Sequence, residues 1–238
     1  MRLAAAFAAA VFLPAETQSA SVDVNPVRID LAGPEQPAEL RLTNTGNTEL
    51  SVQVDTLKWD QDLNGADQYL DTEELLAVPP LFTIPPGEQQ VVRIGYLGQP
   101  SPDLEQSFRL LVTELAAPRT ADSQSSGLAF RMRFSIPAFV APARFPARAE
   151  LALVEVGENE DSIFLTLENS GNAHTQVASV EVRSLGGWQP LPESLTIRYL
   201  LPGTRATILI PPEFESPNAV RISAIDGRDW EYAVRSPF

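Results

Sequence analysis

The acidic stretch DQDLNGADQYLD, residues 60–71, follows a metal-binding pattern more closely than any other part of this sequence. Oxygen-bearing side chains stand at its first, third and fifth positions, which are Asp60, Asp62 and Asn64. With Gly65 next, this fits the start of a helix–loop–helix calcium site. However, Asp67 occupies a position that is normally apolar, Asp71 replaces the usual final glutamate, and the flanking residues have a strand pattern. We therefore expect an acidic hairpin loop and no metal site.

The sequence contains no other pattern typical of an enzyme's active site. The only histidine, His174, lies in an Asn/Gly turn, where we expect it to be solvated. One histidine cannot build a multi-histidine metal site, and no cysteine is present. The sequence also lacks a G-x-S-x-G nucleophile motif and a phosphate-binding loop. We expect a protein that is not an enzyme and needs no cofactor.

The segment SSGLAFRMRFSIP, residues 125–137, could instead bind another chain. Two rows alternate along it: Leu128, Phe130, Met132 and Phe134 on one side, and Ala129, Arg131, Arg133 and Ser135 on the other. This period of two predicts a strand, and the polar run before it predicts a loop. The strand could be an ordinary core strand. If its edge is exposed, it is an aggregation hazard unless a partner strand adds to it.

Composition narrows the class of partner. The net charge is −14, which speaks against general nucleic-acid binding because that requires a basic surface. Of the 17 basic residues only Lys58 is a lysine. Two arginines close together in one strand are therefore conspicuous against an acidic background.

The N-terminus predicts export. Arg2, an apolar run, Pro14 and a short polar segment have the order of a signal peptide, which we place at residues 1–20. No other stretch is apolar enough for a membrane helix, so we expect a soluble mature chain without stable membrane insertion.

The remainder predicts an all-β protein. Short segments rich in Val, Ile, Leu and Thr alternate with Pro, Gly and Asn, and 21 prolines fit poorly into helices. LRLTNTGNTELSVQV (40–54) resembles LTLENSGNAHTQVASVEV (165–182), and TIPPGEQQVVRI (83–94) resembles YLLPGTRATILI (199–210). This repeat predicts two tandem immunoglobulin-like β-sandwiches at a fixed angle, at 21–142 and 143–238, joined by a proline-rich connection.

The ordered set NPVRIDL, LTNTG, PPLFTIPPGEQQVVRI, LEQSFRLLVTEL and RMRFSIPAFV resembles the periplasmic chaperones of the chaperone-usher pilus pathway, especially its archaic branch. The resemblance covers the mature chain and is strongest over residues 22–140. It implies a non-enzymatic periplasmic protein that binds pilus subunits and delivers them to an outer-membrane usher. Each subunit lacks one strand of its fold, and the chaperone lends an edge strand in its place.

The resemblance also implies roles for individual residues. Leu128, Phe130 and Met132 become the donor residues that fill the subunit's groove. Arg28 and Arg133 match the two basic residues that hold the subunit's C-terminal carboxylate. Arg93 is a weaker third candidate for this anchor.

One family position differs. Other members place an arginine after the donor strand, where it joins a salt bridge between the two domains, and this sequence has Pro137 there. Glu105 and Asp226 match the two acidic members of that set. We therefore expect other contacts to help hold the angle between the domains.

Two alternative hypotheses assign the chain a function other than that of a chaperone. A pilus subunit or adhesin would carry an N-terminal donor extension and an incomplete sandwich. A generic immunoglobulin-like or carbohydrate-binding module would present aromatic residues on a concave face, whereas Trp59, Trp188 and Trp230 are scattered through the sequence and expected in the core or at its rim.

Overall fold

The structure is a computed structural model that describes residues 22–33, 35–116, 131–159, 162–192, 199–214 and 216–234. The predicted signal peptide, residues 1–20, lies outside these ranges. Within them every regular element is a strand, and no helix could cross a membrane. The expected all-β class is confirmed.

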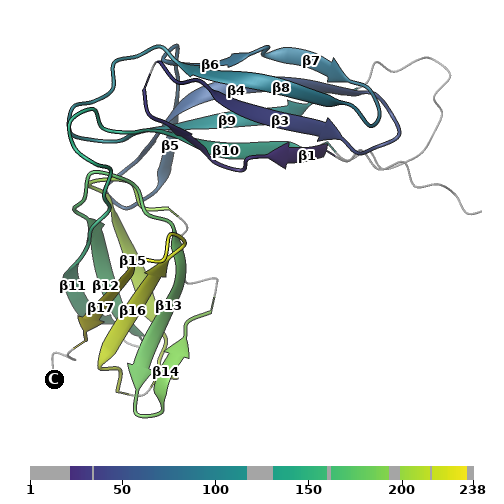
Figure 1. The fold of residues 1–238 in the computed structure, drawn as a ribbon. Coiled ribbons are helices and arrows are strands. Elements are labelled where there is room, and N and C mark those ends of the chain that lie inside the picture. Colours follow the sequence, from purple (N-terminus) through teal and green to yellow (C-terminus); the bar gives the residue numbers. More distant parts are fainter. Residues whose placement is uncertain are drawn as a thin grey trace, which may run out of the picture.

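Two sheets pack together in the first sandwich (Figure 1). One has the strand order β1-β3-β8-β6, and the other has the order β2-β10-β9-β4-β5, with β7 also paired to β4. The strands of this sandwich are β1 (Val22–Asn25), β2 (Ile29–Leu31), β3 (Ala38–Asn44), β4 (Leu50–Gln61), β5 (Asp67–Asp71), β6 (Leu75–Val78), β7 (Leu81–Ile84), β8 (Gln89–Tyr96), β9 (Gln106–Glu114) and β10 (Arg133–Val140).

The second sandwich has the sheets β11-β12-β15 and β14-β13-β16-β17. Its strands are β11 (Leu151–Asn159), β12 (Ser162–Asn169), β13 (Val177–Ser184), β14 (Gly187–Pro190), β15 (Arg205–Ile210), β16 (Ala219–Ala224) and β17 (Asp229–Ala233). The two sandwiches form an L (Figure 1), as expected for two tandem domains set at an angle.

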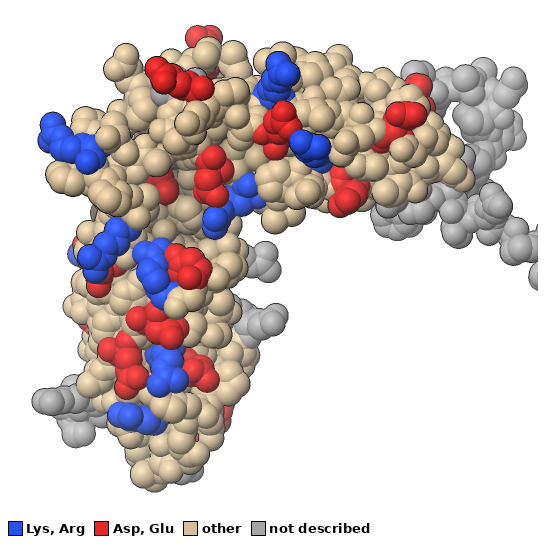
Figure 2. All heavy atoms as spheres, viewed as in Figure 1, with Lys and Arg blue, Asp and Glu red and all other residues tan. Residues whose placement is uncertain are grey.

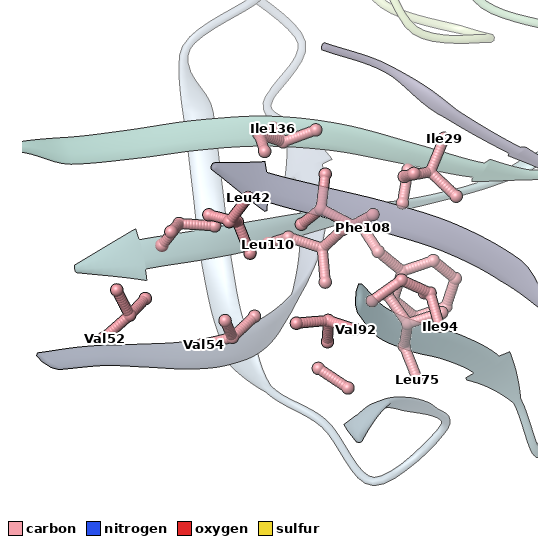
Figure 3. Packing of buried hydrophobic residues seen from close by; sticks show 14 of the residues in the cluster. Ile29, Leu42, Val52, Val54, Leu75, Val92, Ile94, Phe108, Leu110 and Ile136 are labelled. Atoms are coloured by element: carbon pink, nitrogen blue, oxygen red, sulfur yellow. The ribbon is translucent and has the colours of Figure 1, made fainter. Parts of the chain in front are cut away.

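Alternation along the strands builds a separate core in each sandwich. In the first, Ile136 of β10 and Ile29 of β2 point into the same interior as Leu42 and Phe108 (Figure 3). All four are at most 4% exposed. The strand β10 is therefore anchored by its own inward-facing side chains.

The predicted repeat is visible in two buried asparagines at equivalent strand ends. Asn44 Nδ2, at the end of β3, donates to the carbonyl oxygens of Thr48 and Ile84 at 2.7 and 2.9 Å. Asn169 Nδ2, at the end of β12, donates to two carbonyl oxygens of its own sandwich at 2.8 and 2.9 Å. The same residue type thus closes the same turn twice.

The two Pro-Gly turns are equivalent as well. Gly87 and Gly203 have φ values of 75° and 76°, which glycine adopts without the steric cost of a side chain. Their amides donate to the carbonyl oxygens of Asn44 and Asn169 at 2.8 and 2.7 Å. Each turn is therefore tied to the asparagine of its sandwich.

Candidate functional site

The strand β10 has one edge that is only partly covered. It pairs with β9 along its whole length, from Arg133 to Val140. Its other edge pairs with β2 only over Ala138–Val140, in parallel. Within the described part of the chain, Arg133–Pro137 therefore keeps an edge with no strand beside it. Such an edge can accept a strand from another chain.

One face of β10 carries a continuous apolar row. Phe134 and Ile136 pack on the core of the first sandwich, and alternation places the half-buried Met132 on the same side. The backbone of Met132 extends the ladder, because its carbonyl oxygen accepts from the amide of Glu114 at 3.0 Å. The other two predicted donor residues, Leu128 and Phe130, lie outside the described residues.

Arg133 lies on the opposite face of β10, where it is exposed. It borders a groove of about 680 Å³ whose walls include Leu57, Leu111 and Val78. It forms no ion pair with any described residue. Its charge is thus available to a ligand.

Most other basic side chains are neutralised locally. On the face of the second sandwich seen in Figure 2, acidic and basic residues lie side by side. Arg221, for example, lies 3.5 Å from Glu181 and 3.3 Å from Glu231. Arg133 has no such acidic partner among the described residues.

Arg28 lies on the same sheet as Arg133. It precedes β2 and pairs with Asp30 at 3.0 Å, with both side chains exposed. Because Ile29 lies beside Ala138 in parallel register, Arg28 lies beside Pro137. Arg133 is four residues away along β10, or roughly 13 Å. Two long side chains can reach a carboxylate lying between these positions.

Arg93 does not join them. It lies on β8, in the other sheet of the first sandwich, between the core residues Val92 and Ile94. Its exposed side chain therefore points outward from the opposite layer. The core separates Arg93 from the two arginines on the β10 sheet.

The prediction that His174 is a solvated turn residue is wrong. Its ring stacks on Phe139 with centroids 3.5 Å apart, and its side chain is only 13% exposed. His174 Nδ1 lies 2.6 Å from Glu105 Oε1, which also accepts from the His174 amide at 3.0 Å. Turn sequence alone could not reveal this because the partners come from the other sandwich.

Glu105, which the sequence predicts at the junction, links the two sandwiches through His174. Asp226 forms its ion pair with Arg228 of the same sandwich. The hydrogen bond from Arg228 lowers the pKa of Asp226, and the charge of His174 acts in the same direction. Asp226 therefore has its ion pair within the second sandwich, whereas Glu105 contacts His174 across the junction, and Pro137 contributes no charge.

Gln61 is a second link that the sequence did not suggest. Its Oε1 accepts from the Leu201 amide at 2.9 Å and from Thr204 Oγ1 at 3.2 Å. Its Nε2 donates to Asp67 at 3.0 Å and to the Tyr199 carbonyl at 3.2 Å. One side chain at the end of β4 thus satisfies several groups of the second sandwich.

The prediction that residues 60–71 form a hairpin is confirmed, because β4 and β5 pair antiparallel around this turn. Its Asp67 accepts hydrogen bonds from Gln61 and from the indole of Trp59 at 2.9 Å. Burial acts to raise the pKa of Asp67, but these bonds, a hydrogen bond from Tyr69 and the charge of Arg109 together lower the pKa. The acidic hairpin thus helps to order the junction between the sandwiches.

Replacing Gln61 with alanine should weaken this junction. The Leu201 amide would lose its partner in a buried position, at a cost of about 1–3 kcal/mol. We expect the melting temperature to fall by about 2–12 °C and small-angle scattering to show a broader distribution of shapes. Gln68→Ala, on the exposed strand β5 of the same hairpin, is the matched control. Identical melting and scattering of the two variants would show that Gln61 does not hold the angle.

The sequence was also compared with known proteins. Residues 21–146 match the family described as pili and flagellar-assembly chaperone, PapD N-terminal domain. This match spans more than half of the chain. A comparison with curated proteins found no matching sequence.

Solved structures give similar folds over nearly the whole chain. One is the CsuC–CsuE chaperone–tip adhesion subunit pre-assembly complex from archaic chaperone-usher Csu pili of Acinetobacter baumannii, with 24% identity, a TM-score of 0.66 and coverage of 92% of this chain and 100% of that chain. The Salmonella enterica SafA pilin–SafB chaperone complex gives 20% identity and a TM-score of 0.67. This match covers 92% of this chain and 98% of that chain. The Pseudomonas aeruginosa CupB2 chaperone is 18% identical, with a TM-score of 0.57, and the match covers 89% of this chain and 98% of that chain.

Proposed function

Because the chain belongs to the pili and flagellar-assembly chaperone family, we propose that it works in the periplasm and holds pilus subunits on the free edge of β10. Chaperoning of pilus assembly is the role of the family. The predicted signal peptide supports export. The sequence resemblance supports an outer-membrane usher as the protein that receives the subunits.

The observation that carries the proposal is the unpaired edge over Arg133–Pro137. A subunit strand that adds there would gain backbone hydrogen bonds, while Met132 and the residues before it would enter the subunit's groove. Each fully buried apolar side chain contributes about 1.5–3 kcal/mol. In this proposal the added strand pairs with the first sandwich alone. We also propose the domain boundaries expected from the sequence, with the first domain at 21–142 and the second at 143–238.

The subunit's C-terminal carboxylate fixes the register of the added strand in this proposal. Arg28 and Arg133 lie on the outer face of the β10 sheet and can donate charge-assisted hydrogen bonds to it. Paired hydrogen bonds are directional, so they select one alignment of the two strands.

Co-expression tests the proposal. The full chain is tagged and expressed with a pilin of the same bacterium, and the periplasmic fraction is captured on the tag. We expect an equimolar complex, with pilin that is degraded when the chain is missing. Recovery of the chain alone, with pilin equally unstable in its presence and absence, would contradict the proposed function.

A further inference from the structure

Arg109 is a buried arginine that faces the same surface as the two anchor residues. Its neighbours Phe108 and Leu110 are in the core, so alternation turns Arg109 to the outer face of β9. The register places it directly beside Pro137 of β10. Since Arg28 lies on the other side of Pro137, two arginines flank a residue without charge.

Asp67 compensates the charge of Arg109 only in part, because the charge of Arg109 acts to lower the pKa of Asp67 although the two side chains form no ion pair. Arg109 is 8% exposed, and its guanidinium carbon lies 3.7 Å from the ring centroid of Trp59 and 5.4 Å from that of Tyr199. These aromatic faces attract a cation. Yet Nε has no hydrogen-bond partner, and no carboxylate of the described residues lies within ion-pair distance. Buried charges are normally paired.

The charges of Arg109 and Arg28 both act on the hydroxyl of Tyr199. Burial raises the pKa of Tyr199, while the positive charges of Arg109 and Arg28 both act to lower it. Both guanidinium groups therefore lie within electrostatic range of the Tyr199 hydroxyl. Arg28 uses Nε for Asp30, and its terminal nitrogens form no hydrogen bond with any of the residues that the structure describes.

We propose that Arg109 is a third arginine of the carboxylate anchor, and that the C-terminal carboxylate of the pilus subunit lies near Pro137, on the side toward Arg133, with Arg28 and Arg109 on either side of it. This inference rests on the proposed function and specifies the partner group of the same site. A carboxylate here receives donors from both sides and supplies an acceptor for Arg109 Nε, which has no hydrogen-bond partner among the described residues. The stacking of Arg109 on Trp59 fixes its guanidinium, whereas exposed Arg28 and Arg133 close on the carboxylate as the strand adds.

The position of Arg109 connects subunit binding to the junction between the sandwiches. Its guanidinium lies on Trp59, which belongs to the interface cluster with Phe139 and Leu201. A purely structural cation–π contact would stabilise this junction without regard to the subunit's terminus. The carboxylate itself therefore has to be varied to distinguish the two roles.

The test compares a pilin with a free C-terminal carboxylate and the same pilin with an amidated C-terminus. Titrations use the full chain, Arg109→Met and Arg109→Lys, with Arg93→Met as a control on the opposite sheet. For Arg109→Met we expect at least about a 30-fold loss of affinity for the free-acid pilin and less than about a 3-fold change for the amide. Arg109→Lys should lose less affinity for the free acid, because it retains the charge without the paired donors.

Each outcome decides the question. Equal losses for the acid and the amide would show that Arg109 only stabilises the junction, and unchanged affinity for both would remove it from the site. If Arg109→Met does not fold, the acid-selective loss must appear in Arg109→Lys, or the inference fails. Failure of the unaltered chain to bind either pilin would instead refute the proposed function, and the inference with it.

Discussion

Replacing both Phe130 and Met132 with aspartate is expected to leave a folded protein that no longer captures pilus subunits. In the sequence, the pair continues the alternation of Phe134 and Ile136, which both pack on the core of the first sandwich. Burial of the two side chains in a subunit would contribute about 3–6 kcal/mol together, which corresponds to more than about 100-fold in affinity. A carboxylate that enters an apolar groove without a partner adds a further penalty.

Circular dichroism and melting establish whether the double variant folds, and pull-down with a pilin establishes capture. The matched control is the double variant Phe130→Leu and Met132→Leu, which keeps both side chains apolar and should retain capture. A folded double-aspartate variant that still binds pilin would remove these residues from the donor row.

Charge reversal at either arginine of the proposed anchor is expected to stop pilin accumulation while the chaperone persists. Arg28→Glu or Arg133→Glu would place a negative charge beside the subunit's terminal carboxylate and replace attraction with repulsion. The melting temperature should change by only about one or two degrees. Arg133 has no ion pair within the described ranges, and the exposed Arg28–Asp30 pair contributes little.

Periplasmic pilin levels, measured with and without each variant, test this expectation. Arg93→Glu is the control, because Arg93 lies on the outer face of the opposite sheet. Normal pilin levels with both anchor reversals and a loss with Arg93→Glu would transfer the anchor to Arg93.

The strand that carries the proposed function was predictable because its period is local. Alternation in RMRFSIP places apolar and basic residues on opposite faces wherever the strand lies. The two asparagine turns were predictable for the same reason, since each asparagine bonds within its own sandwich. What the sequence could not specify is which edge of β10 remains open, because that depends on where β2 pairs with it.

The junction between the sandwiches was mostly missed. His174 and Glu105 are 69 positions apart, and Gln61 and Leu201 are 140 positions apart. Local patterns carry no information on such pairs. They also do not distinguish burial in a core from burial between domains, which is where Trp59 lies.

Arg109 did leave a signal in the sequence. It is the single charge within the apolar run SFRLLV, and a charge there requires either a partner or an outward position. The structure shows the outward position, together with burial beneath aromatic rings. A lone charged residue inside a strong strand pattern is therefore a candidate for a binding role.

The departure at Pro137 has a structural counterpart. Pro137, at the position where the sequence resemblance predicts an arginine, is uncharged, and the link to Glu105 is made by His174 from the second sandwich. The neighbouring arginines at 28 and 109 lie on either side of Pro137. The proline itself is buried and carries no charge, so the arginines on either side of it are the donors of the proposed site.

Amide hydrogen exchange of the free chain and of its complex with pilin tests the central claim most directly. Amides of residues 131–136 that do not bond to β9 should exchange fast in the free chain and slowly in the complex, because the subunit's strand pairs with them. Unchanged exchange at these amides, with new protection confined to the second sandwich, would show that the subunit binds elsewhere and would contradict the account.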